Sequence, residues 1–124
     1  TPSSASNKIL VMVQMNVSSG GEFTMKLLRT AAGSTSEIGS SSAGNYTCFT
    51  GGFHNTARSG YYDLVSKDFF FLDDAQDTNA HAYKVQWANI TNITTYLNRT
   101  AYSASGTHYS YSGSSTITLM EVEV

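Results

Sequence analysis

The sequence predicts an all-β domain, an antiparallel β-sandwich with jelly-roll-like connections. Three observations favour this fold class. Apolar and polar residues alternate over short segments, turn residues recur every ~8 to 15 positions, and β-branched, aromatic and small polar residues dominate the composition. No segment carries a convincing helical pattern. The single proline, Pro2, lies outside every expected strand, as a ladder-breaking residue should.

The clearest strand covers residues 8–17. Its apolar residues share one face, since side chains alternate along a strand, and they are Ile9, Val11, Val13, Met15 and Val17. Residues 18–21 form a turn that contains two glycines, and residues 23–30 return. The pattern therefore predicts an antiparallel hairpin between 8–17 and 23–30.

The later strands are shorter. Residues 31–45 form a Ser/Gly-rich connection with room for a short strand around Ile38. Further strands are expected at 46–50, 64–72, 80–88, 94–99 and 116–124. Gly51 and Gly52 are expected to close the first of these strands, with irregular structure following at 53–61.

The composition excludes several classes of protein. Charged residues make up only 13% and aromatic residues 12%, so the chain can bury enough apolar surface to avoid disorder. A formal net charge of −2 leaves no basic surface for nucleic acid. No apolar run approaches the ~20 residues that span a bilayer, so no membrane insertion is expected. Cys48 is the only cysteine, which excludes an internal disulfide and favours a buried, inert side chain.

Four segments, in order, resemble a known family. Residues 114–122 resemble the ending "SSITLMEI", and residues 3–11 resemble "PSSASSKILV". Residues 71–74 followed by 81–86 resemble "FLDSP…TYKVQ", and residues 96–99 resemble "YINR". These patterns belong to small β-domains in the tail-fibre and other virion proteins of tailed phages, many from marine sources.

The resemblance implies a jelly-roll-like virion domain, commonly trimeric, at the distal end of a fibre, where it binds the host surface or caps an assembly. Residues 1–124 are then expected to be one domain, the C-terminal part of a longer virion protein. Family members carry another strand or two before the "PSSASS" segment. Because a jelly roll pairs its first and last strands, residues 116–124 are expected to lack a partner. An upstream segment or a neighbouring chain should cover this edge, since a bare apolar edge aggregates.

Two tyrosine clusters are the candidate receptor-binding sites. Rigid amphipathic rings among small polar residues suit adaptable recognition, including sugar rings stacked on tyrosine. The first cluster is Tyr102, His108, Tyr109 and Tyr111, near Asn98 and Arg99. The second is Arg58, Tyr61 and Tyr62, near His54. The alternative is that these rings pack against the sheet or a neighbouring subunit with their hydroxyls in water.

A sandwich with few charges favours burial between identical subunits. The second face of strand 8–17 carries Leu10 and Met12, where we expect an oligomer interface. Trp87 alternates with Val85 and Tyr83, so it is expected in the core or in the same interface. Cyclic, three-fold symmetry is the simplest arrangement.

No cofactor, metal or catalytic site is predicted. Asp73, Asp74 and Asp77 lie in one expected turn, where aspartate bonds to backbone; calcium ligation is the alternative. His54, His81 and His108 lack metal-binding spacing, although in a trimer one could bind a metal on the three-fold axis. The acids are too scattered for a glycosidase pair.

The predicted function is therefore a non-enzymatic phage virion protein of the tail-fibre or receptor-binding type. It would be a homotrimer that contacts other virion proteins and a host-surface receptor, a glycan, and it would be located in the virion. One alternative is a head-decoration or cement protein. Another is a secreted lectin-like adhesin, in which five N-x-S/T sequons would carry glycans, namely Asn16, Asn45, Asn89, Asn92 and Asn98.

Overall fold

A computed structural model describes residues 1–40, 50–54, 63–89, 92–101 and 110–124. Over these residues the chain is all-β, as predicted, with no helix. No helix that could cross a membrane is therefore present in the described part of the chain. The strands are β1 (Lys8–Ser19), β2 (Glu22–Ala31), β3 (Ser34–Ile38), β4 (Gly51–His54), β5 (Val65–Asp73), β6 (His81–Asn89), β7 (Thr95–Leu97) and β8 (Thr116–Val122).

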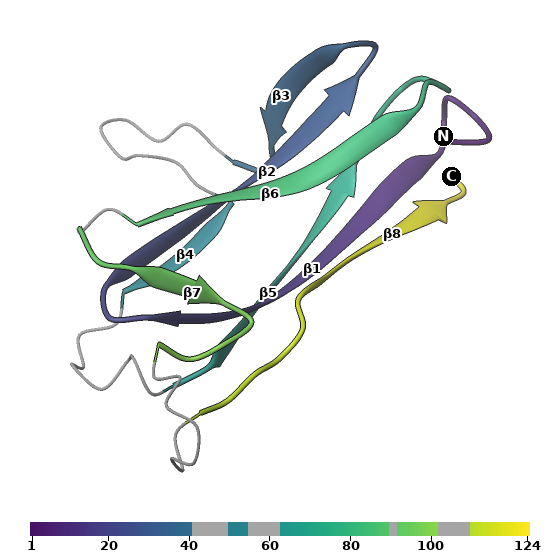
Figure 1. Ribbon diagram of the computed structural model, residues 1–124. Helices are drawn as coiled ribbons and strands as arrows, with labels where there is room; N and C mark the ends of the chain where they lie inside the picture. The colour runs from purple at the N-terminus through teal and green to yellow at the C-terminus, as the bar shows by residue number, and fades with distance from the viewer. Residues whose placement is uncertain (41–49, 55–62, 90–91, 102–109) are drawn as a thin grey trace.

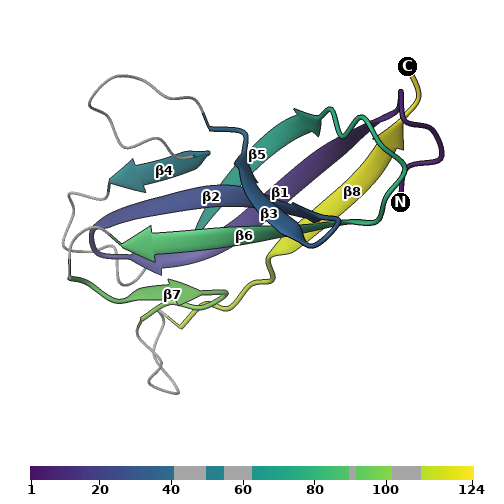
Figure 2. The same cartoon turned by 90° about the horizontal axis from the view of Figure 1, so that it is seen from above.

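The strands form two four-stranded antiparallel sheets, each built around one long strand (Figure 1). In the first, sheet A, β1 pairs with β5 along one edge and with β8 and β7 along the other. In the second, sheet B, β2 pairs with β6 along one edge and with β3 and β4 along the other. Figure 2 shows the two sheets as layers, with β2 lying over β1.

The predicted hairpin between the first two strands is wrong. Both strands form within about two residues of the expected bounds, but β1 belongs to sheet A and β2 to sheet B, and neither pairs with the other. The physical reason is that each strand has a face that is apolar over most of its length. Paired side by side, they would present one wide apolar face to water. Folded over at Gly20 and Gly21, they bury these faces against each other.

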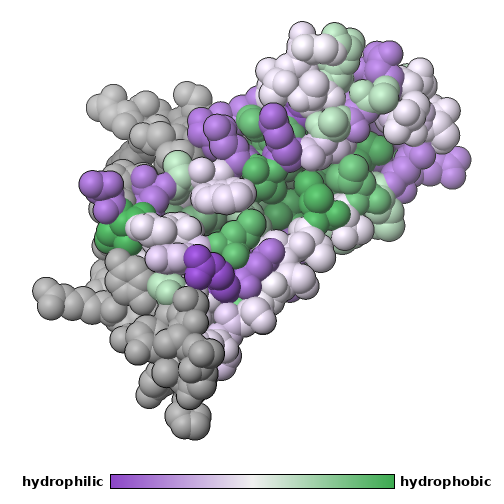
Figure 3. All heavy atoms as spheres, viewed as in Figure 1, coloured by the Kyte–Doolittle hydropathy of each residue, from purple (hydrophilic) through white to green (hydrophobic). Residues whose placement is uncertain are grey.

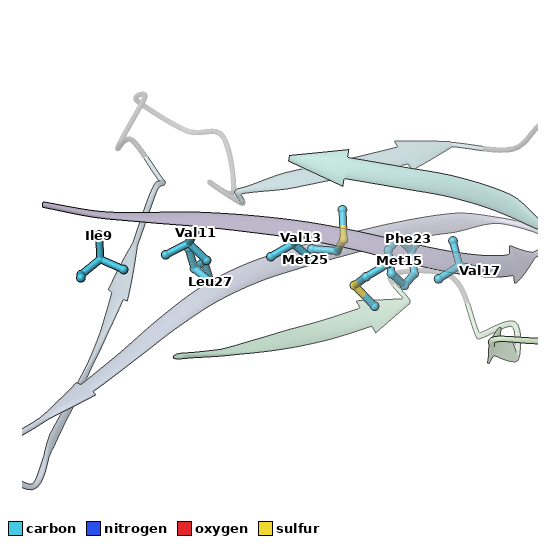
Figure 4. Close-up of a cluster of buried hydrophobic side chains, with 8 residues drawn as sticks. All are labelled: Ile9, Val11, Val13, Met15, Val17, Phe23, Met25 and Leu27. Atoms are coloured by element: carbon cyan, nitrogen blue, oxygen red, sulfur yellow. The ribbon is translucent and has the colours of Figure 1, made fainter. Parts of the chain in front are cut away.

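The core is the layer between β1 and β2 (Figure 4). Its side chains are Ile9, Val11, Val13, Met15, Val17, Phe23, Met25 and Leu27, none more than 7% exposed. The face predicted for β1 is therefore confirmed. Burying one such side chain contributes ~1.5 to 3 kcal/mol, so this single row of contacts is the main force that holds the sheets together.

The last strand has a partner on one edge. β8 pairs with β1 over seven positions, from Lys8 opposite Val122 to Gln14 opposite Thr116. The expectation that this segment lacks a partner is wrong for that edge, because β1 is itself the first strand of the sandwich. Along its other edge, β8 pairs with no strand in the described residues. The cover predicted for that edge stays a prediction.

A strand occupies Gly51 and Gly52, where a closing turn was expected. The segment before Thr50 lies outside the described residues, as does Cys48, while β4 runs from Gly51 to His54 and pairs with the start of β2. A Cβ on Gly52 would stand 2.7 Å from the carbonyl oxygen of Phe23. The absence of a side chain at Gly52 therefore allows β4 to approach β2 closely. From the sequence alone, the same glycine reads as a turn residue.

Candidate functional site

Most of the predicted receptor-binding residues lie outside the described residues, namely Arg58, Tyr61, Tyr62, Tyr102, His108 and Tyr109. Tyr111 is described, and its side chain is 53% exposed. The described strands that lead to these two segments end at the same end of the sandwich. β4 ends at His54, opposite Glu22, and β7 pairs with the last residues of β1. β4 therefore ends, and β7 begins, near the turn between β1 and β2.

Tyr111 is held by its backbone beside Thr100. Thr100 N–H donates to the carbonyl of Tyr111 (3.1 Å), and Tyr111 N–H donates to Thr100 Oγ1 (3.3 Å). Arg99 and Ser112 form an isolated bridge next to this pair. The buried Thr100, 1% exposed, anchors the pair while the tyrosine ring stays in water. An exposed ring on a fixed backbone loses little entropy when it binds a ligand.

Arg99 lies over the ring of Tyr96, with 4.5 Å between the guanidinium carbon and the ring centroid. Such a cation–π contact contributes ~0.5 to 1 kcal/mol at an exposed position. It leaves the guanidinium donors at the surface of the same strand end as Tyr111. Arg99 was expected beside the first tyrosine cluster, whereas Tyr96, three residues earlier in the "YINR"-like segment, was not among the predicted site residues.

Asn98 links β1 to the segment before β8 through hydrogen bonds. Its φ of 61° is in the left-handed region, which asparagine tolerates better than most residues. Its N–H donates to the carbonyl of Asn16 (2.8 Å), and its Oδ1 accepts from Ser115 Oγ (2.6 Å). Asn16 Nδ2 in turn donates to the carbonyl of Ser114 (2.6 Å). Two sequon asparagines are thus structural, because both side chains are used inside the fold.

A second polar network lies beside it, between the two sheets. Asn89 Nδ2 donates to Thr95 Oγ1 (3.0 Å) and to Ser19 Oγ (3.3 Å), and Thr95 Oγ1 donates to Ser19 Oγ (3.1 Å). Ser19 is 2% exposed. These bonds tie the end of β6 to β7 and β1, so the strand end that carries Tyr96 and Arg99 is fixed to both sheets.

The acidic residues of the expected turn play separate parts. Asp73 is not a turn residue but the inward-facing end of β5, 4% exposed. It accepts from Arg29 Nη1 at both oxygens (2.9 and 3.0 Å) and from the hydroxyl of Tyr83 (2.7 Å). Burial, together with the hydrogen bond to Asp73, raises the pKa of Tyr83 above its usual range.

Asp77 does support the turn, as predicted. Its carboxylate accepts from the Asn79 N–H (2.6 Å), which together with the His81 ring lowers its pKa. The Nε2 atom of His81 lies 2.9 Å from the same carboxylate oxygen. In the described part of the chain, no three His, Cys, Asp or Glu side chains group as a metal site. Calcium ligation by Asp73, Asp74 and Asp77 therefore has no geometric support.

An apolar groove runs between β6 and β8, which are edge strands of the two sheets over the described residues. Figure 3 shows apolar side chains gathered between these strands. Trp87, Ile117 and Leu119 take inward-facing positions by register, yet they are 44%, 43% and 48% exposed. A cavity of about 280 Å³ lies among Trp87, Leu97 and Ile117, and one of about 180 Å³ among Ile9, His81 and Leu119. The sandwich is open along this side.

The predicted interface residues fall on two different surfaces. Leu10 and Met12 point outward from sheet A, on the face opposite the core. Trp87 lines the groove between the sheets. The structure therefore does not bring the three residues together. Trp87 takes a core-facing position on β6 in sheet B, whereas Leu10 and Met12 take solvent-facing positions on β1 in sheet A.

Comparison with known proteins adds no relative: no family model, no curated protein and no solved structure matches this chain.

Proposed function

We propose that this chain is a non-enzymatic structural domain of a tailed-phage virion, of the tail-fibre or receptor-binding type, that attaches the particle to a host-surface glycan. The all-β fold is consistent with the resemblance on which the proposal rests. The first and last segments of that resemblance form parts of β1 and β8, which pair with each other in sheet A. These two segments of the resemblance thus belong to one continuous piece of sheet.

The observation that carries receptor binding is the exposed ring of Tyr111 on a backbone fixed to Thr100. A pyranose ring stacks on such a ring through its C–H face, and its hydroxyls accept hydrogen bonds from a cation such as Arg99. Each site of this size binds weakly, so attachment depends on several copies acting together on one cell.

The test is binding of a Tyr111→Ala variant to bacterial cells and to an array of bacterial polysaccharides. We expect at least a tenfold loss of cell binding, about 1.4 kcal/mol, because one stacked ring is removed. An Ile117→Ser variant instead removes an exposed apolar side chain from the groove side of β8, away from the oligomer interface expected at Leu10 and Met12, and should bind glycan as before. Full binding by Tyr111→Ala, with unchanged circular dichroism, would contradict the proposal.

A head-decoration or cement protein is the second candidate. The apolar outer face of sheet A favours it, because such a face suits lateral contact with other proteins of a capsid. Gold-labelled antibody against the chain distinguishes the two: label at the tail tip supports attachment, and label over the head supports decoration.

The secreted adhesin is the weakest candidate. Glycans on Asn16 or Asn89 would break the hydrogen bonds that their Nδ2 atoms donate inside the fold.

A further inference from the structure

A small cavity lies between the two sheets where β8 ends and β6 begins. Its volume is about 180 Å³, and the residues that line it include Pro2, Ile9, His81, Leu119 and Glu121. An apolar cavity of ~150 Å³ in a protein can hold one benzene molecule, so this cavity has room for a single ring-sized ligand. A ligand of that size contacts both polar residues of the lining, His81 and Glu121.

His81 supplies a hydrogen-bond acceptor that has no partner in the described part of the chain. Its side chain is 2% exposed, and its Nδ1 atom is buried without a hydrogen bond. The other ring nitrogen, Nε2, lies 2.9 Å from the Asp77 carboxylate, which can only accept, so Nε2 carries the proton of the neutral ring. Nδ1 therefore keeps its lone pair. A buried acceptor without a donor costs free energy, which a ligand that donates to it recovers.

The charges around the cavity favour a cation. Glu121 lines the cavity, and the Asp77 carboxylate lies at the other nitrogen of the imidazole. The α-ammonium of Thr1 offsets one of these two charges, since it lies close enough to Glu121 to help lower the pKa of that carboxyl. The Arg29–Asp73 ion pair adds no net charge. Two carboxylates against one ammonium leave the surroundings of the cavity negative.

The remaining charges near this end lie outside the cavity. Lys8, opposite Val122, is on the outer face of sheet A, and Asp74 follows the residue that pairs with Ile9, so these two opposite charges lie beside each other. The Tyr83 hydroxyl, at the cavity wall, already donates to Asp73. The polar groups left for a ligand are therefore acceptors, and a ligand must bring the donors.

We propose that this cavity binds a small primary ammonium compound with an apolar, ring-sized body. The ammonium group donates to His81 Nδ1 and to the Glu121 carboxylate, and the body packs against Ile9 and Leu119. A metal ion fits less well, because no third His, Cys, Asp or Glu joins these two residues in the described part of the chain. The inference does not rest on receptor binding, since Tyr111 is fixed near the opposite end of β1.

The experiment titrates the 124-residue chain, labelled with ¹⁵N at histidine, with benzylamine at about pH 7.5, where histidine is ordinarily neutral. Long-range ¹H–¹⁵N NMR follows Nδ1 of His81, whose signal moves when its lone pair accepts a hydrogen bond. We expect a dissociation constant on the order of 1 mM, as suits a ligand of about eight non-hydrogen atoms. Benzyl alcohol has the same ring and a neutral donor, and it should bind at least about fivefold more weakly. Benzoate should not bind.

Two variants separate the two contacts, with binding followed at the backbone amide of Leu119. His81→Phe keeps a ring but removes Nδ1, and it should weaken benzylamine binding at least about tenfold. Glu121→Gln keeps the shape but removes the charge, and it should weaken benzylamine about fivefold while leaving benzyl alcohol unchanged. Glu123→Gln, two residues further along, is the matched control and should change neither. Circular dichroism checks the fold, and Glu121→Gln carries the test if His81→Phe does not fold.

Three results would overturn the proposal. The first is no movement of the Nδ1 signal with benzylamine at about 50 mM. The second is equal affinity for the amine and the alcohol, or full affinity for the amine in Glu121→Gln. The third is a response to Zn²⁺ alone with none to benzylamine, which would make this a metal site instead.

Discussion

Arg29 on β2 and Asp73 at the end of β5 form an ion pair that joins the two sheets, in which Arg29 Nη1 donates to both carboxylate oxygens. The Asp73 side chain is 5% exposed and that of Arg29 is 23% exposed. Beyond the apolar core, this pair is a directional contact that fixes how sheet B sits over sheet A at the end of the sandwich away from Tyr111.

Asp73→Asn should therefore lower the free energy of unfolding by about 3 kcal/mol, because it leaves the partly buried Arg29 without its counter-charge. Asp74→Asn changes an exposed neighbour and should stay within ~0.5 kcal/mol of the original. Urea titration followed by circular dichroism measures both. Equal stabilities for the two variants would show that the ion pair adds nothing to the packing.

Tyr83 should titrate later than an ordinary tyrosine. Its pKa is raised in the folded chain, so its contribution to stability is complete below the ordinary value near 10 and is lost as pH rises through the higher folded value. Tyr83→Phe should remove this alkaline dependence and cost ~1 kcal/mol at neutral pH. The absorbance of tyrosinate, followed during a pH titration of the wild type and of the variant, tests whether Tyr83 ionises late. The variant should lack the last tyrosine to ionise.

Stability should also fall in acid through Glu121. This carboxylate accepts from Asn7 Nδ2, Ser3 N–H and Ser3 Oγ at 2.6 to 2.7 Å, which lowers its pKa to about 2. Its contribution is present above its ordinary pKa near 4.5 and is lost as pH falls from there toward 2. Thermal melts at pH 5, 4, 3 and 2 should show a smaller acid decrease in Glu121→Gln than in Glu123→Gln.

Gly52→Ala should destabilise the chain by about 1 to 3 kcal/mol, since the new methyl group meets the backbone oxygen of Phe23 at 2.7 Å. Gly51→Ala meets only the flexible end of Met25, at 3.3 Å, and should be milder. Thermal unfolding compares the two. A larger loss for Gly51→Ala would mean that β4 does not approach β2 as closely as described.

Along its second edge, β8 pairs with no strand in the described residues, and such an open apolar edge should make the 124-residue chain prone to aggregate. Leu119→Lys places a charge on the groove side of this edge and should slow aggregation at 37 °C, measured by light scattering. Thr116→Lys adds the same charge on the outer face, near the start of the strand, and should do less. If both variants aggregate like the original, the β8 edge is not the site of association.

Local alternation was enough to predict the strands but not their partners. The faces of β1 and β6 follow from residue spacing alone, because every second side chain points the same way. Whether β1 pairs with β2 or folds over it depends on burying two apolar faces at once, which no single segment reveals. Residue type misled at Gly52, where a glycine serves close strand packing rather than a turn.

The candidate site was predicted only in part, for a similar reason. Tyr111 was predicted from its Ser- and Gly-rich surroundings; the structure shows it exposed, and its role in receptor binding stays a prediction. Phe70, Leu72 and Met120 were missed as neighbours of Leu10 and Met12, since only the register of three strands brings them together. Apolar residues at the outward-facing positions of β5 and β8 were the signal that could have identified these three side chains. The partner of Asp73, 44 residues earlier in the chain, leaves no local trace.

The pairing of β1 with β8 has a consequence for biosynthesis. Lys8 leaves the ribosome before its partner Val122, which follows more than a hundred residues later. The edge of β1 that pairs with β8 therefore stays without those hydrogen-bond partners until β8 is made, and such distant pairings form slowly. We expect the nascent polypeptide to depend on chaperones until β8 has been synthesised. Chains whose translation stops before β8 should be degraded by proteases.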